Sequence, residues 1–263
     1  MKGSERWSDL APRVISGIAL AAAAGVAVWL GGPTFIGFVA LICGLVVWEL
    51  ARMVAPEAGK AALALGFFSG LCSVLGIWIP LAYALPILAL PGLAGAIWLQ
   101  QNRWLYASLA VFVLYAGYSM DAVRNDMGAV WLVWLALAVI ATDIAGYFVG
   151  RALGGPKFWP ALSPKKTWSG TVGGWLAAGL VGVFFTWLLP GGIWLVLLSL
   201  AVSLCSQLGD MAESAAKRQL GVKDSSRLLP GHGGVFDRFD GMMGGALCVL
   251  IIRAVSDYPL AGG

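Results

Sequence analysis

The residues able to do chemistry in this chain are concentrated between positions 214 and 240. Five lysines and arginines, three carboxylates and the only histidine lie there, although only 11% of the whole chain is charged. Such a density of charge in an otherwise apolar chain indicates binding or catalysis. Cations interspersed with carboxylates suit a polyphosphate bound together with Mg²⁺, which takes carboxylate and phosphate oxygens as ligands.

The residues that lead into this stretch share one helical face. Asp210, Glu213, Ser214 and Lys217 are spaced i, i+3, i+4 and i+7, which aligns their side chains along one side of an α-helix. An amphipathic helix end that reaches into water is the alternative. We predict a metal ligand at Asp210, because a carboxylate close to a membrane needs a metal ion or a lysine as its partner.

A glycine-rich loop follows and ends in two carboxylates. Glycines flank His232, and glycine allows the main chain to approach a ligand closely. Asp237 and Asp240 are three residues apart and share a face if a helix begins there. Carboxylates also stabilise helix N-termini, which would explain one of the two without any ligand.

A third candidate element lies earlier in the chain. Asp143 is near the end of an apolar segment, and Ser163, Lys165 and Lys166 precede an expected helix start. Helix N-termini that carry hydroxyls and lysines form anion sites. The alternatives are an Asp143 that pairs with a neighbouring lysine, and lysines that only anchor the protein at the membrane surface.

The remainder of the chain must hold these residues at a membrane. Of the 263 residues 60% are hydrophobic, and mean hydropathy is +0.85, whereas a soluble domain has about 25% charged residues. We predict an all-α fold, a polytopic integral membrane helical bundle. Segments of about 20 apolar residues can cross the bilayer. Nine such segments are expected, at 13–31, 34–53, 61–79, 82–99, 104–120, 128–149, 170–189, 192–212 and 241–256.

The positions of lysine and arginine predict the orientation of the bundle. With the N-terminus in the cytoplasm, every lysine and arginine except Arg124 and Arg253 falls on the inner side. Lys60 has no motif around it and is expected to act only as an anchor. The inner loops richest in charge are 150–169 and 213–240. We therefore divide the chain into an N-terminal transmembrane scaffold, 1–125, and a C-terminal catalytic region, 126–263.

Four motifs in this order resemble those of the phosphatidate cytidylyltransferases, also called CDP-diacylglycerol synthases. The resemblance extends over about 141–245, and Ser169 stands where that family usually has glutamate, so no acid role is assigned there. The order Ile144-Ala-Gly146 also departs from the usual small residues. The motifs are Asp143-Ile-Ala-Gly-Tyr-Phe-Val-Gly-Arg151, Ser163-Pro-Lys-Lys-Thr-Trp-Ser-Gly170, Gly209-Asp-Met-Ala-Glu-Ser-Ala-Ala-Lys-Arg218 and His232-Gly-Gly-Val-Phe-Asp-Arg-Phe-Asp240.

The resemblance implies that a phosphate oxygen of phosphatidic acid attacks the α-phosphorus of CTP and that pyrophosphate leaves. It implies Mg²⁺ as cofactor, a bacterial inner membrane, a site that faces the cytosol and no nucleic-acid partner, and it leaves a homodimer open. The expected catalytic residues are Asp210, Asp237, Lys217, His232 and Asp240. The expected metal ligands are Asp210 and Asp237, followed by Asp143 and Asp240. The expected phosphate contacts are Ser163, Lys165, Lys166, Ser214, Arg218, Lys223 and Arg238.

Two other functions remain open at this point. A CTP-dependent polyprenol or phytol kinase would use the same nucleotide, but it would need a base for the lipid hydroxyl. An ion-coupled transporter would keep Asp143 and Asp210 inside the membrane. A transporter leaves the dense loop of cations and carboxylates unexplained.

Overall fold

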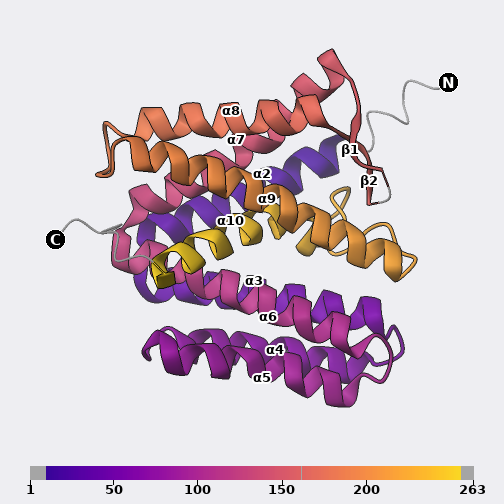
Figure 1. Cartoon of the computed structure of the whole chain (residues 1–263). Coiled ribbons are helices and arrows are strands. Elements are labelled where there is room, and N and C mark those ends of the chain that lie inside the picture. The colour runs from indigo at the N-terminus through magenta and orange to yellow at the C-terminus, as the bar shows by residue number, and fades with distance from the viewer. Residues whose placement is uncertain (1–9, 161, 256–263) are drawn as a thin grey trace. The chain divides into compact units, whose positions relative to one another are not determined.

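The computed structural model describes residues 10–160 and 162–255, and nearly all of them are helical (Figure 1). These residues form two compact units. The first takes in the chain up to Asp121 together with Gln219–Phe239, and the second takes in Ala122–Arg218 together with the chain from Asp240. The stretch 219–239, which we call the signature loop, therefore belongs with the N-terminal helices rather than with the segments next to it in sequence.

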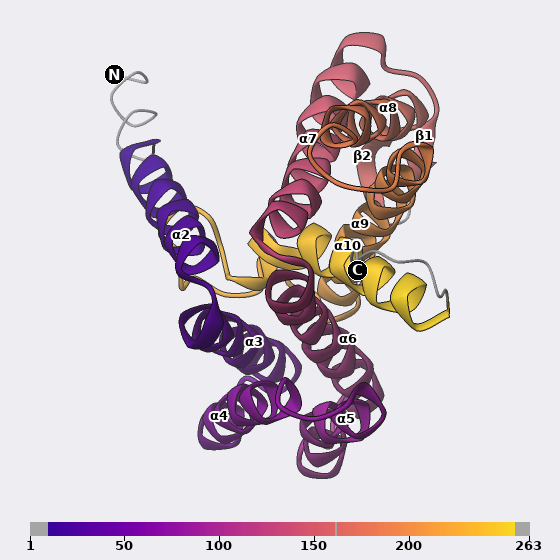
Figure 2. The ribbon, with the colours of Figure 1, turned by 90° about the vertical axis from the view of Figure 1, so that its left-hand side faces the viewer.

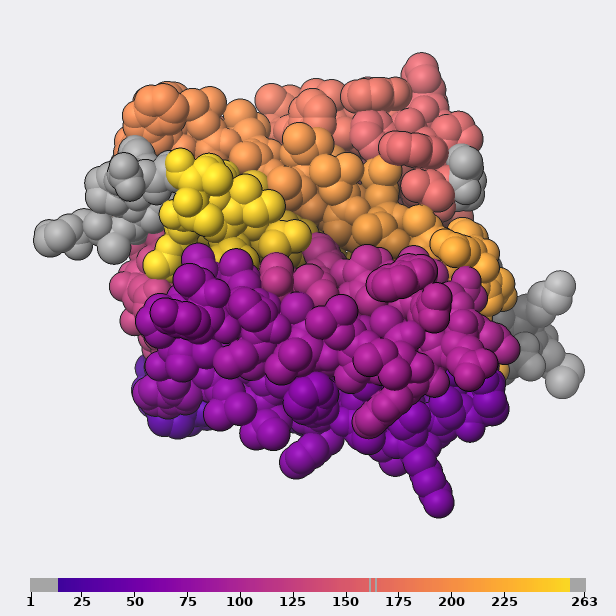
Figure 3. Space-filling model, turned by 60° about the horizontal axis from the view of Figure 1, so that its bottom comes forward, coloured from indigo at the N-terminus to yellow at the C-terminus, as the bar shows by residue number. Residues whose placement is uncertain are grey.

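The first unit is built from antiparallel helices joined by short turns. They are α2 (Leu10–Leu30), α3 (Gly32–Val54), α4 (Gly59–Gly76), α5 (Leu81–Trp98) and α6 (Arg103–Ala122). The turn into α3 uses Gly31, whose φ of 64° lies in the left-handed region that glycine tolerates. Figure 3 shows the face formed by α4, α5 and α6. Phe67 and Trp78 of this part of the chain are 79% and 71% exposed, as expected for residues that contact lipid.

The second unit begins with a π-helical turn, η1 (Val123–Met127), and continues in α7 (Ala129–Leu153), α8 (Trp168–Phe185) and α9 (Ile193–Gln219). It also contains α10 (Phe236–Val255) from Asp240 onward. Between α7 and α8 a small hairpin pairs β1 (Lys157–Trp159) antiparallel with β2 (Ser163–Thr167). Helices α7 and α8 approach closely at glycines. A Cβ on Gly170 would lie 3.2 Å from the Cα of Gly150, so side chains are excluded there.

The expected class, a polytopic helical membrane protein, is confirmed. Within 10–160 and 162–255, seven helical segments are long and apolar enough to cross a membrane: α3, α4, α5, α6 with η1, α7, α8 and α9. The first expected span falls in α2, whose apolar part is the shorter Val14–Leu30. The ninth falls in α10, which carries charged residues in its first and last turns.

Two boundaries differ from the expectation. The segment expected as loop from 213 is helical up to Gln219, because Ala, Glu, Lys, Arg and Gln favour helix and the first glycine comes at 221. The segment around Ser163 forms strand β2 rather than irregular loop.

Candidate active site

Three carboxylates meet where α9 and α10 pack together. One oxygen each of Asp210, Glu213 and Asp240 lies within 4.8 Å of the others. The helices come this close because both have glycine at the contact: a Cβ on Gly209 would lie 3.0 Å from the Cα of Gly244 and 2.5 Å from the carbonyl oxygen of Asp240. Close backbone packing therefore brings Asp240 to the acidic face of α9.

The electrostatics of this cluster favour a bound cation. Asp240 directly follows the first turn of α10 and precedes the apolar part of that helix. Burial raises the pKa of Asp240 to about 8, and the negative charge of Asp210 adds to the rise. Lys217 forms an ion pair of 2.6 Å with Glu213, the third carboxylate of the cluster. Three carboxylates are ligands that Mg²⁺ prefers, so these residues fit the expected metal.

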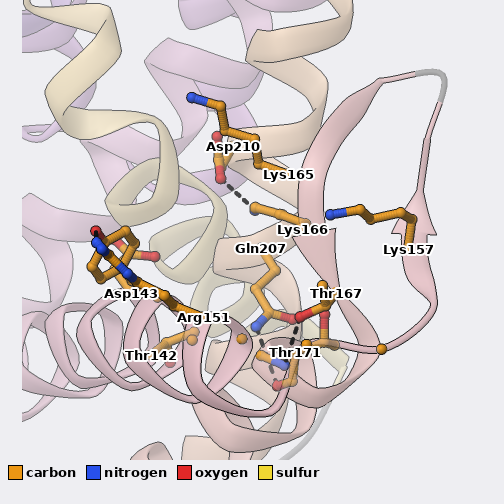
Figure 4. Close-up of a pocket in the computed structure, with 16 residues that line it drawn as sticks. Thr142, Asp143, Arg151, Lys157, Lys165, Lys166, Thr167, Thr171, Gln207 and Asp210 are labelled. Carbon is orange, nitrogen blue, oxygen red and sulfur yellow. Dashed lines mark hydrogen bonds and ion pairs between the residues drawn. The ribbon is translucent and has the colours of Figure 1, made fainter.

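A cavity of about 630 Å³ opens beside Asp210 and is lined by α7, the hairpin, α8 and α9 (Figure 4). Lys166 reaches into it from β2 and forms an ion pair with Asp210. Lys157, Lys165 and Arg151 also line it, and Asp143 of α7 supplies a second carboxylate. A cavity with four cations and two carboxylates can hold phosphate groups beside a metal ion.

Hydrogen bonds connect the helices that form the walls of this cavity. Gln207 of α9 accepts a bond of 3.1 Å from the Nε1 of Trp175 and donates one of 3.3 Å to the carbonyl of Thr171. The hydroxyl of Thr142 on α7 donates to that of Ser203 on α9, at 2.7 Å. Such bonds between apolar helices have few competitors in lipid, which makes the relative placement of α7, α8 and α9 specific.

The hairpin places the lysines by strand alternation and a helix cap. Thr167 is the N-cap of α8: it is buried, and its Oγ1 accepts a bond of 3.2 Å from the backbone N–H of Gly170. The preceding Lys166 is half-buried at the cavity and Lys165 is exposed. Ser163 lies at the other end of β2, paired with Trp159, and does not line the cavity.

The signature loop of the first unit is organised around Asp237. Its Oδ2 accepts hydrogen bonds from the N–H and hydroxyl of Ser225, both 2.9 Å, and from the N–H of Gly234 at 2.7 Å. A cavity of about 680 Å³ lies against this loop, and Lys223, His232 and Arg238 line it. Two residues expected to contact phosphate, Lys223 and Arg238, thus lie beside the expected catalytic His232.

Comparison with known proteins identifies the family. Residues 11–256 match the cytidylyltransferase family. The chain belongs to the cytidylyltransferase family. It is 37% identical over 263 residues to the phosphatidate cytidylyltransferase of Brucella suis biovar 1, with 96% of each chain covered. It is 34% identical over 231 residues to that of Staphylococcus haemolyticus, which covers 81% of this chain, and 40% identical over 151 residues to that of Helicobacter pylori strain J99, which covers 57%.

This member of the cytidylyltransferase family supports its signature loop with Glu49, a residue that the sequence analysis missed. Glu49 of α3 is fully buried. Its Oε1 accepts bonds from the hydroxyl of Ser226 at 2.6 Å and the N–H of Val235 at 2.8 Å. Its Oε2 accepts a bond from the N–H of Phe236 at 2.8 Å and lies 3.1 Å from the hydroxyl of Ser225, whose single proton it shares with Asp237. One carboxylate therefore ties both ends of the loop to α3.

Helix α2 contacts the same loop at His232. The hydroxyl of Ser16 lies 2.7 Å from the Nδ1 of His232 and donates a bond of 3.1 Å to the carbonyl of Pro230. Gly17 leaves room for the imidazole, because a Cβ there would lie 3.2 Å from its Cε1. Helix α2 thus contacts both a histidine and the main chain of a loop that belongs to the family motif.

The residues expected from the sequence fall into groups within the two units. In the second unit Asp143, Lys165, Lys166 and Asp210 share the cavity of Figure 4, Asp240 and Lys217 lie at the carboxylate cluster, and Ser214 and Arg218 lie on the last turns of α9. In the first unit Lys223, His232, Asp237 and Arg238 belong to the signature loop.

Glu213 takes a place in the cluster that the sequence analysis did not assign to it, although its spacing from Asp210 was a sufficient signal. For Glu49 the signal was a single carboxylate within an apolar span.

Proposed function

We propose that the carboxylates of Asp210, Glu213 and Asp240 hold the magnesium ion with which this chain makes CDP-diacylglycerol and pyrophosphate from CTP and phosphatidic acid. The activity follows from the family and from relatives that carry it in their names at 37% identity over 96% of the chain. The observation that supports the metal site is the carboxylate cluster next to Lys166. Asp237 remains a predicted ligand, with its Oδ2 engaged by the loop.

The proposed mechanism is a single in-line displacement. A phosphate oxygen of phosphatidic acid forms a bond to the α-phosphorus of CTP, while the bond from that phosphorus to the bridging oxygen breaks and pyrophosphate leaves with the electron pair. A bound magnesium ion would neutralise negative charge on the phosphate oxygens. No base is needed, because the second pKa of a phosphate monoester is about 6.

The cations of the chain hold the two polyanions in position. Lys166 and Lys165 donate charge-assisted hydrogen bonds to phosphate, which are stronger than neutral ones. Lys217 orients Glu213 through their ion pair. His232 donates to a phosphate, with its ring held by Ser16. Holding both reactants in line supplies much of the rate enhancement expected of such a site.

Labelled CTP tests this function with purified chain, phosphatidic acid and Mg²⁺. Label at the α-phosphorus should appear in extracted lipid, and label at the γ-phosphorus should appear only in pyrophosphate. Incorporation should stop on chelation of divalent ions and return with Mg²⁺, because the charge of the carboxylate cluster and the phosphates is then compensated. γ-Label in the lipid would instead identify a lipid kinase, and no incorporation of either label would refute the enzyme assignment.

We also propose that the chain lies in a bacterial cytoplasmic membrane with the hairpin and the signature loop in the cytosol, since lysine and arginine gather there. Cysteine-accessibility labelling of intact cells checks this orientation. Lys157→Cys and Lys223→Cys should resist a membrane-impermeant thiol reagent, whereas Asn125→Cys, also exposed, should react. The unaltered chain gives the background from its own four cysteines. Labelling of position 157 or 223 from outside would reverse the proposed orientation.

A further inference from the structure

Two adjoining cavities in the first unit have no part in the chemistry above. One, of about 650 Å³, lies where α3 ends and α4 begins and is lined by Arg52, Lys60 and Arg227. The other, of about 700 Å³, follows α3 and α4 and is lined by apolar residues. Trp48 and Leu63 line both cavities, so the two adjoin each other, and together we call them the α3–α4 groove.

The apolar part of the groove results from close packing of two helix backbones. Helices α3 and α4 lie side by side (Figures 1 and 2). A Cβ on Gly44 would lie 2.9 Å from the carbonyl oxygen of Gly66, so the floor has no side chains at this point. Leu41 and Phe67 line the same cavity and are 59% and 79% exposed. The groove is thus a concave feature of the packed helices.

The groove has the length of one lipid leaflet. On α3 its lining residues extend from Gly37 to Trp48. At 1.5 Å per residue this is about 16 Å, roughly half of the ~30 Å hydrocarbon core of a bilayer. An acyl chain that runs from the membrane surface to the bilayer centre would therefore fit along it.

The polar end of the groove is strongly cationic. Arg52 is held at the end of α3 by a hydrogen bond of 2.6 Å from its Nη1 to the carbonyl of Pro56. Lys60 lies in the first turn of α4, and Arg227 lies on the signature loop. Asp224 is the one carboxylate among the residues that line this cavity. A phosphate monoester carries a charge of about −1.5 to −2 near neutral pH, which complements this excess. A zwitterionic head group has no net charge and does not complement these cations.

The signature loop forms part of both ends of the groove. Arg227 lines the cationic cavity and its neighbour Leu228 lines the apolar one. Ser226 and Arg227 also line the loop cavity that contains His232. A lipid in the groove would therefore contact the loop that Glu49 and Asp237 hold in place.

We propose that the α3–α4 groove binds phosphatidic acid, with its phosphate beside Arg52, Lys60 and Arg227 and one acyl chain along α3 and α4. The inference rests on the proposed function in taking this lipid as the acceptor substrate. Lys60, expected from sequence to be only an anchor, then contacts the substrate.

Photo-crosslinking without CTP tests the binding directly. Purified chain is irradiated with a phosphatidic acid that carries a diazirine on one acyl chain, and the labelled peptides are mapped. Labels should fall within 37–48 and 63–74. Gly37→Phe places a ring where a Cβ has no neighbour within 4 Å and should lower the yield about fivefold by filling the groove. Gly25→Phe makes the same change at an equally open position of α2 and should leave the crosslinking yield unchanged.

Labels found only on other helices, or equal yields from the two phenylalanine variants, would overturn the proposal. So would equal labelling by a diazirine phosphatidylcholine, because the cations would then play no part in selecting the lipid.

Kinetics test the role as acceptor site. Lys60→Gln should raise KM for phosphatidic acid about tenfold and leave kcat and KM for CTP unchanged, because it removes one charged contact to the lipid phosphate. Arg103→Gln, an exposed cation that lines none of these cavities, is the control. An unchanged KM in the Lys60 variant would refute the acceptor site. A wild-type chain that is labelled in the groove but makes no CDP-diacylglycerol would support the groove and refute the proposed function.

Discussion

Asp210→Asn should lower kcat about 100-fold or more, equivalent to about 2.7 kcal/mol of lost transition-state stabilisation. The substitution keeps the shape of the side chain and removes its charge. Asp210 is where the carboxylate cluster meets the cationic cavity, since it lies with Glu213 and Asp240 and also pairs with Lys166. Loss of its charge would weaken metal binding and leave Lys166 without its partner.

Activity measured across a range of Mg²⁺ concentrations checks this result, with correct folding verified by size exclusion in detergent. Asp126→Asn is the matched control: Asp126 also forms an ion pair, at 3.0 Å with Arg253, but its side chain is 56% exposed. Exposed pairs contribute about 0–1 kcal/mol, so this variant should keep nearly full activity. If Asp210→Asn kept near-parental turnover at every Mg²⁺ concentration, the metal site would have to be placed elsewhere.

Glu49→Gln should lower activity at least about tenfold, and Glu49→Ala further, although Glu49 is a positioning residue. Its carboxylate binds the hydroxyl of Ser226 and two backbone N–H groups, and it shares the hydroxyl of Ser225 with Asp237. An amide has one accepting oxygen, so its NH₂ group would face a backbone N–H. A buried donor left without a partner costs about 1–3 kcal/mol, and the signature loop would loosen.

Hydrogen exchange separates this effect from general destabilisation. Exchange in the signature loop should rise in the Glu49 variants, while exchange in α7 and α8 of the second unit stays unchanged. Glu57→Gln, an exposed acid in the turn after α3, should change neither exchange nor activity. Uniformly faster exchange would show that Glu49 stabilises the whole fold, and unchanged exchange with normal activity would show that the loop does not depend on it.

The sequence by itself determined the class of the fold and the face of α9. Long apolar segments must be helical in lipid, because every backbone N–H and C=O needs a partner within the protein, so hydropathy alone predicts the spans. Helical periodicity likewise places Asp210, Glu213 and Lys217 on one side, and the structure joins Glu213 to Lys217 by an ion pair. The motifs indicated the family that the comparison with known proteins confirmed.

Only the tertiary structure decided which distant residues meet. Asp240 lies close to Asp210 because glycines allow α9 and α10 to pack closely. The spacing of residues in the sequence does not indicate which glycines face each other. Glu49 binds Val235 and Phe236 across 186 and 187 positions of sequence. Local pattern determines the face that each helix presents, but the choice of neighbour depends on the complementary packing and hydrogen bonding of whole surfaces, which short-range spacing does not encode.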